Sequence, residues 1–588
     1  MIPIANTTWP IMKIPVTAWF VIFFIVAGNC LGSIESSVST QEAALVDSIK
    51  LFEAQCFDSI QISIGDYHRG LAYYDEMIER MLMLAQQFPD SNYVALAYDW
   101  LERKKNLKLL TLLRSGYWPV SSLDGDPNES LSMALDQLRV SSKVGAMLLN
   151  AMKHPIAIEA IMEKCIDDKQ AIINFWVTQD RIVAFVMSCD SLSVVQWHCS
   201  RRLVENKIDL LMKPFYNSSD PFRLEFSVKT AHDLYKLLFQ PLEVRLKNAK
   251  SICVIPDEMF FGLPFELLLC SLPAHNSVNE RALYQELGSL DYLIRHYATS
   301  YNYSTALLAL ITDSYRSMKT LRHRLLTMSE PLAPNKSGIW ASKPLLQVNW
   351  RNDYEVEEIK RVSRLLFRHD NLRQQQANKS YFLTAGPNYR WIHLTLPAPL
   401  DNSNVFESGI IFSCAPDDSV GISAWLTLEE LLQSSFSADL LTMGNSQLLS
   451  FSSHGNPGVI ALPQVFLLAG VRSVIFRLWP VNCLSTSQYL AKFYWELKYK
   501  RQTASQALQE AKIASLKETF TLDNREISRA HPFFWAGFQL VGNPQISPPS
   551  PTKLPPMAVI GLVYVVVILV SLVITRKTMP KHRKLIFK

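Results

Sequence analysis

The stretch Pro463-Gln-Val-Phe-Leu-Leu-Ala-Gly-Val-Arg-Ser-Val-Ile-Phe-Arg-Leu-Trp479 predicts a helix followed by a buried strand. Gly470 suits the left-handed position that follows a helix, and Ser473–Trp479 is short, apolar and rich in β-branched residues. Further short strands alternate with amphipathic helices, and we expect them in the same sheet, around Ile252, Ile392, Ile410 and Leu440. This alternation indicates an α/β fold, a mostly parallel sheet flanked by helices on both faces.

Two other kinds of pattern come before these alternating strands and helices. Residues 34–125 have the apolar periodicity of helices, with a stripe at Val94, Ala97, Tyr98 and Leu101. These helices resemble the end of a tetratricopeptide array, but no clean 34-residue repeat is visible, so a plain helical subdomain remains an alternative. Three β-prone runs then predict an antiparallel meander: Ile172–Val177, Arg181–Ser188 and Leu192–Trp197.

The composition argues against several kinds of ligand. The chain of 588 residues is long enough for two to four domains, and its net charge of +5 comes largely from the last dozen residues. The body is therefore close to neutral, which argues against a nucleic-acid partner. No phosphate-binding glycine loop is present, and none of the nine cysteines forms a Cys-x-x-Cys pair. We therefore expect no cofactor and no metal.

Both ends of the chain carry apolar segments. Met557–Thr575 has no charged residue and, at 1.5 Å per residue, spans about 28 Å as a helix, which is enough to cross a bilayer. Residues 1–33 combine a short apolar run with small residues and predict a signal peptide or an uncleaved signal anchor. The proline-rich residues 546–556 predict an extended stalk.

The basic tail, residues 576–588, sets the expected orientation. Basic residues remain on the cytoplasmic side of a membrane helix, so the C-terminus is expected in the cytoplasm. The body is then expected on the extracellular, periplasmic or lumenal side of a single-pass membrane protein.

Short motifs inside the α/β body carry a family resemblance. They follow one another in a fixed order, beginning with Val254-Ile-Pro-Asp257 and Leu263-Pro-Phe-Glu-Leu-Leu268. Thr427–Leu431 with Ala438-Asp-Leu440 comes next, and His531–Phe538 closes the series. Their order and spacing resemble the CHAT domain family, which is caspase-like and often follows tetratricopeptide repeats. The resemblance implies a domain over residues 126–545 with its core at 168–545.

The resemblance also implies where catalytic residues should be. Active members are expected to be cysteine peptidases with a His-x-x-x-His-Gly loop and a Ser-Ala-Cys-Glu-Thr-Gly loop, each after a strand. The first histidine matches His393, but the catalytic histidine falls on Pro397 and the cysteine falls on Ser446, or on Ser452 in a looser register. Proline cannot accept a proton, and a serine hydroxyl ionises far less readily than a thiol. We therefore expect no catalytic residues, and a binding or scaffold module with a protein or peptide partner.

Two alternatives remain open at this point. A hydrolase could use Ser446 or Ser452 with His454, or Cys414 with His393. The domain could also be a structural partner within a larger complex.

Overall fold

The structure is a computed structural model that describes a large part of the chain. The described residues are 45–52, 64–89, 92–115, 143–153, 155–217, 225–273, 286–316, 325–332, 358–362, 369–400, 408–415, 422–444, 446–448, 457–479, 481, 483–522, 525–547 and 568–571. The predicted signal segment, the basic tail, Ser452 and His454 lie outside these residues, as does most of the predicted stalk.

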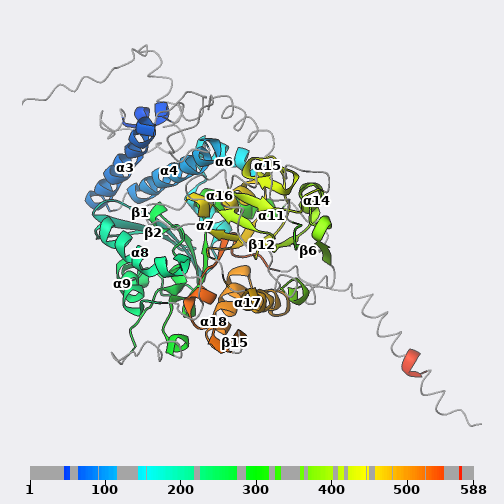
Figure 1. The fold of residues 1–588 in the computed structure, drawn as a ribbon. Coiled ribbons are helices and arrows are strands. Elements are labelled where there is room, and N and C mark those ends of the chain that lie inside the picture. Colours follow the sequence, from blue (N-terminus) through cyan, green and yellow to red (C-terminus); the bar gives the residue numbers. More distant parts are fainter. Residues whose placement is uncertain are drawn as a thin grey trace, which may run out of the picture.

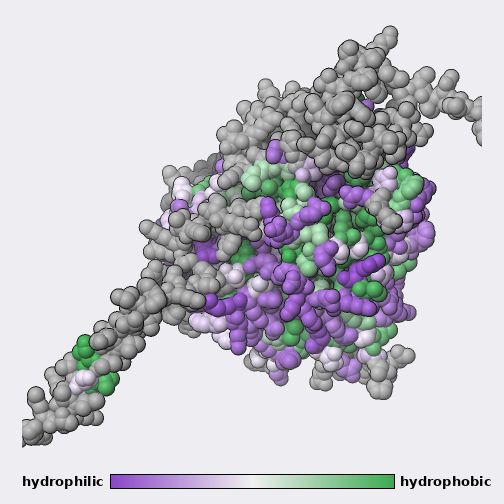
Figure 2. Space-filling model, turned by 180° about the vertical axis from the view of Figure 1, so that it is seen from behind, coloured by the Kyte–Doolittle hydropathy of each residue, from purple (hydrophilic) through white to green (hydrophobic). Residues whose placement is uncertain are grey.

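The predicted membrane segment 557–575 is described only at residues 568–571, which are helical. Ile568, Leu569 and Val570 are exposed there and appear as a hydrophobic spot in Figure 2. In the described part of the chain, no helix combines the length and the apolar character that a membrane crossing requires. Elsewhere on the face shown in Figure 2, hydrophilic side chains make up most of the coloured surface.

The helical front contains the helices that the sequence predicts. Helices α3 (Ile64–Gln87) and α4 (Tyr93–Ser115) lie side by side, followed by α6 (Lys143–Lys153) and α7 (Ile158–Cys165) (Figure 1). Ala97, Tyr98 and Leu101 of the predicted apolar stripe are buried. The stripe therefore packs α4 against its neighbours, since burying apolar side chains is the main force that holds such helices in place.

The centre of the molecule is a sheet of eleven strands in the described residues, in the order β3-β2-β1-β4-β5-β17-β14-β12-β8-β6-β7. The strands are β1 (Gln170–Val177), β2 (Arg181–Met187), β3 (Leu192–His198), β4 (Ser251–Ile255), β5 (Ala298–Tyr301), β6 (Leu325–Ser329), β7 (His369–Arg373), β8 (Trp391–Leu394), β12 (Leu440–Met443), β14 (Ser473–Arg477) and β17 (Phe538–Gly542). The predicted meander is confirmed as β1, β2 and β3, which pair in antiparallel fashion.

The rest of the sheet consists of two parallel blocks. Strands β1, β4, β5 and β17 run in one direction, and β14, β12, β8, β6 and β7 run in the other. The blocks meet where β17 pairs with β14 in antiparallel fashion. The mostly parallel sheet predicted from the alternation of strands and helices is therefore confirmed.

Helices cover both faces of this sheet (Figure 1). Helices α11 and α16 contact the helical front, whereas α17 and α18 contact each other and α18 packs against β5 and β17. Their bounds, with those of the remaining α-helices, are α8 (Arg201–Asn217), α9 (Val228–Leu238), α11 (Thr305–Arg316), α14 (Lys379–Ala385), α15 (Leu428–Leu432), α16 (Pro457–Leu468), α17 (Cys483–Trp495) and α18 (Ala504–Ser515). Gly470 has a φ of 102°, as predicted for the residue that ends α16.

The prediction that Ile410 belongs to the central sheet is wrong. Its strand β10 (Gly409–Ile411) pairs with β11 (Trp425–Thr427) in a separate two-stranded sheet. Strand β8 already has β6 on one side and β12 on the other, so both of its backbone edges are hydrogen-bonded. Strand β10 therefore cannot pair with β8.

A buried ion pair supports the first parallel block. Glu266, in the turn η3 (Phe265–Leu267), pairs with Lys512 of α18, and both side chains are 1% exposed. Lys512 also donates to the carbonyl oxygen of Phe538 in β17 at 2.7 Å. Tyr301 of β5 donates to the other oxygen of Glu266. These contacts hold α18 against the sheet where β5 pairs with β17.

A second buried cluster fixes the other block. The carboxylate of Asp439, just before β12, receives hydrogen bonds from the guanidinium groups of Arg390 and Arg472. Arg390 precedes β8, and Arg472 precedes β14. The Asp439 N–H donates to the Arg390 carbonyl oxygen at 2.7 Å, and the Arg472 N–H donates to the Ala438 carbonyl oxygen at 3.0 Å. One carboxylate thus aligns the starts of three neighbouring strands.

We predict that Asp439→Asn lowers the free energy of unfolding by about 3–5 kcal/mol, because the buried guanidinium groups lose their counter-charge. Chemical denaturation of the purified protein measures this loss. Glu429→Gln, at an exposed position on α15, is the control and is expected to change stability by less than about 0.5 kcal/mol. Equal stability of the two variants would contradict the role given to Asp439.

Candidate functional site

The carboxyl ends of β8 and β12 lie side by side because the two strands are parallel neighbours, with His393 opposite Thr442. The chain continues from each end into a short strand, β9 (Ala398–Leu400) and β13 (Ser446–Leu448), and these also pair in parallel. Ser446 is opposite Ala398, so Pro397 and Ser446 lie in adjoining segments. This confirms the expected neighbourhood of the two strands. In parallel sheets such ends are a common place for a site.

Pro397 joins the end of β8 to β9. Its carbonyl oxygen accepts a hydrogen bond from the Ile411 N–H at 2.9 Å, which ties the segment to β10. The Leu394 carbonyl oxygen accepts from the Gly444 N–H at 2.8 Å, so the segment also contacts the chain that leaves β12. The backbone around Pro397 is therefore held on two sides.

His393 lies within β8, as the sequence predicts, and its side chain is completely buried. Its Nε2 lies 2.7 Å from Oε1 of Glu358, and its Nδ1 lies 3.1 Å from the hydroxyl of Tyr494 in α17. Both ring nitrogens are therefore occupied by protein groups.

Tyr494 extends this buried network. Its hydroxyl donates to the Thr442 hydroxyl at 2.9 Å, and Thr442 is in β12, the strand next to β8. Burial raises the pKa of Tyr494 above its ordinary value, so the phenol stays protonated. A carboxylate, an imidazole and a hydroxyl thus stand in the order of a catalytic triad. The hydroxyl, however, is a buried phenol in the core, so the arrangement ties β8, β12 and α17 together.

Glu358 reaches this network through the space left by Gly444. A Cβ atom added at Gly444 would lie 2.3 Å from Oε1 of Glu358, which is closer than atoms can approach. Glu358 itself is 2% exposed and lies in the helical residues 358–362. Glycine at position 444 is therefore what allows the carboxylate to reach His393.

The other residues considered from the sequence are placed as follows. For Ser446 the structure describes the backbone in β13 but not the side chain. Cys414 is half-buried beyond β10, and its N–H donates to the Leu332 carbonyl oxygen at 3.3 Å. Its suggested partner His393 contacts Glu358 and Tyr494 instead.

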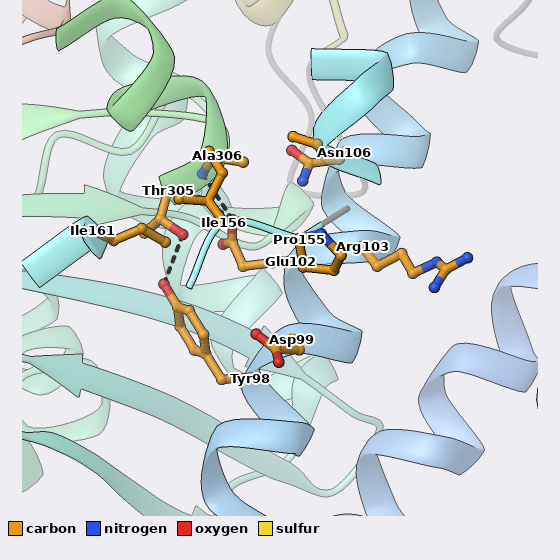
Figure 3. Close-up of a pocket in the computed structure, with 11 residues that line it drawn as sticks. Tyr98, Asp99, Glu102, Arg103, Asn106, Pro155, Ile156, Ile161, Thr305 and Ala306 are labelled. Atoms are coloured by element: carbon orange, nitrogen blue, oxygen red, sulfur yellow. Dashed lines mark hydrogen bonds between the residues drawn. The ribbon is translucent and has the colours of Figure 1, made fainter. Parts of the chain in front are cut away.

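A separate pocket lies where the helical front meets the α/β body (Figure 3). Its volume is about 370 Å³ including the open mouth, and Asp99, Glu102, Arg103 and Asn106 of α4 line one side. The Glu102 carboxylate accepts hydrogen bonds from the N–H groups of Thr305 and Ala306 at the start of α11, at 2.8 and 3.2 Å. Glu102 thus binds α4 to α11.

Asp99 is the other carboxylate of this pocket, and burial, together with the charges of Glu102 and Glu159, raises its pKa to about 7. The pocket therefore holds one carboxylate with fixed partners and one that titrates near neutral pH. Sequence periodicity missed it because Asp99 and Glu102 look like ordinary polar positions beside an apolar stripe.

We predict that Glu358→Leu lowers the free energy of unfolding by about 1–3 kcal/mol, because Nε2 of His393 is left buried without a partner. Glu358→Gln keeps an acceptor oxygen and is expected to cost less than about 1 kcal/mol. Chemical denaturation compares the variants. Lys360→Leu is the matched control, because Lys360 is exposed on the same helical turn. If Glu358→Leu were as stable as the control, the network would not hold the core.

Comparison with known proteins gives the family. The profile of the family described as "CHAT domain" matches residues 228–543. Two curated relatives, tetratricopeptide repeat protein 28 of Homo sapiens and of Mus musculus, are 35% and 28% identical over 119 and 121 residues. Each match covers 20% of this chain and 4% of the relative, so the chain spans only a small part of their length.

Among solved structures, two crystal structures of the Saccharomyces cerevisiae separase–securin complex are similar to this chain. They share 9% and 10% sequence identity with it, at TM-scores of 0.37 and 0.36. The similarity covers 89% of this chain and 42% of the other. Because the family match spans more than half of the sequence, the chain belongs to the CHAT domain family.

Proposed function

We propose that this CHAT domain is a binding or scaffold module without peptidase activity. The observation that carries the proposal is the state of His393, whose two ring nitrogens contact Glu358 and Tyr494 in the core. Four residues later, where the family resemblance implies the catalytic histidine, the chain has Pro397. Nucleophilic catalysis needs a group that accepts the proton of the nucleophile, and proline cannot do so.

The same edge of the sheet supports peptide binding. Strands β9 and β13 extend the chain past the carboxyl ends of β8 and β12 and pair with each other. An extended peptide can add to an exposed strand through main-chain hydrogen bonds, and we place such a peptide beside this pair of strands. A protein or peptide that presents an extended segment is therefore the partner we propose.

We predict that the purified full-length protein retains peptides from a diverse library but does not cleave them. Mass spectrometry of the retained and the released peptides measures both properties. Ser446→Cys combined with Pro397→His is expected to stay inactive. The hydrogen bond between the carbonyl oxygen of residue 397 and the Ile411 N–H keeps the main chain in its present path, whichever side chain is introduced.

Two results would overturn this proposal. Cleavage that is abolished by Ser446→Ala, Ser452→Ala or Cys414→Ala would show a hydrolase and would name its nucleophile. Retention no greater than on an unrelated protein of similar charge would exclude the peptide-binding role.

We also propose that residues 557–575 anchor the protein in a membrane, with the body on the non-cytoplasmic side. The uncharged apolar segment and the basic residues that follow it support this proposal. In intact cells, added protease is expected to remove an epitope within the body and to spare a tag at the C-terminus. Detergent should then expose the tag. A protected body with a cleaved C-terminal tag would reverse the orientation.

A further inference from the structure

Three side chains of types that bind metals come together in the chain segment that connects β4 to β5, apart from β8 and β12 in the strand order. They are Cys270, Asp291 and His296, and one ligand atom from each lies within 4.8 Å of the other two. Nε2 of His296 is 2.7 Å from Oδ1 of Asp291. In the part of the chain that the structure describes, this is the only group of three such residues so close together.

The backbone holds these positions together. Leu269 and Tyr292 form an antiparallel bridge, and the Cys270 N–H donates to the Asp291 carbonyl oxygen at 2.9 Å. Cys270 and Asp291 are thus cross-strand neighbours. The turn η5 (Leu293–Arg295) follows, and its end is closed by the His296 N–H, which donates to the Leu293 carbonyl oxygen at 3.0 Å. The three side chains are therefore gathered by fixed main-chain contacts.

We propose that Cys270, Asp291 and His296 bind a divalent transition-metal ion, preferentially Zn²⁺. Thiolate sulfur, imidazole nitrogen and carboxylate oxygen are the donors that Zn²⁺ takes in proteins. With metal–ligand distances of about 2.0–2.3 Å, tetrahedral donors stand roughly 3.3–3.8 Å apart. A small adjustment of the side chains from their present spacing is enough to enclose the ion.

A neighbouring hydroxyl already orients one of the ligands. The Ser271 hydroxyl donates to Oδ2 of Asp291 at 3.1 Å, which leaves Oδ1 toward His296. The Tyr235 hydroxyl, which donates to Glu243, lies near the Cys270 thiol. Such partners of the ligands commonly tune metal affinity.

The site is open on one side. The side chains of Asp291 and His296 are 38% and 48% exposed, so three protein ligands leave a fourth position for water or for a group from a partner. Bound metal would also join the chain before residues 274–285 to the chain after them. This role is independent of the peptide binding that we propose at β9 and β13.

The test titrates the purified, metal-free, full-length protein with Co²⁺ and then with Zn²⁺. Co²⁺ is expected to bind at one equivalent with the near-ultraviolet absorption of a cobalt–thiolate bond, and Zn²⁺ is expected to displace it. Cys270→Ser should abolish the thiolate band. His296→Gln and Asp291→Asn should each weaken Zn²⁺ binding by at least about tenfold, as losses in metal sites do.

Two matched controls use exposed residues elsewhere, Cys189→Ser after β2 and His198→Gln at the end of β3. Both should bind Co²⁺ and Zn²⁺ like the unchanged protein. Circular dichroism confirms that each variant is folded. Absence of a thiolate band, or a band that persists in Cys270→Ser and disappears in Cys189→Ser, would overturn the proposal.

Discussion

The contact of Asp439 with Arg390 and Arg472 is the constraint on which the carboxyl ends of the second parallel block depend. A strand that slips by one residue turns all its side chains to the opposite face. By joining the starts of β8, β12 and β14, this carboxylate fixes their register. That register then sets His393 opposite Thr442 and Ser446 opposite Ala398 at the far ends of the strands.

The two halves of the sheet use the same physical device. In one half, the ion pair of Glu266 with Lys512 holds α18 against β5 and β17. In the other half, Asp439 binds the arginines that precede β8 and β14. A buried charge is costly unless it is paired and hydrogen-bonded, so each cluster tolerates only one arrangement of its surroundings. Both acidic residues belong to family motifs seen in the sequence, Leu263–Leu268 and Ala438–Leu440. Their place in the structure gives the acidic residues of these two motifs a role in holding the fold together.

Much of the fold was accessible from the sequence because buried strands and amphipathic helices leave periodic signals. The meander, the strand after Gly470 and the neighbourhood of β8 and β12 were predicted in this way. Strand β5 was missed because Ala298-Thr-Ser-Tyr301 is short and half polar, although all four residues are buried. The pairing of β10 was predicted wrongly, since local pattern carries no information about which sheet edges are already taken.

The candidate site was predictable in part. The motif spacing placed Pro397 and Ser446 in adjoining segments, because the strands that carry them are neighbours. It could not reveal Glu358 or Tyr494 as partners of His393, since these contacts join residues far apart in the chain. The cluster of Cys270, Asp291 and His296 escaped notice for the same reason: the rule based on paired cysteines detects ligands that are close in sequence.

The lack of a side chain at Gly444 also has a consequence for the sequences that this edge of the sheet can carry. The family resemblance places a serine at this position, yet any side chain there collides with Glu358. Glu358 in turn holds the buried imidazole of His393, so the two positions cannot change independently. A side chain at position 444 would therefore require the Glu358 carboxylate to leave its place beside His393. The packing of the core thus limits which residues this edge of the sheet can accept.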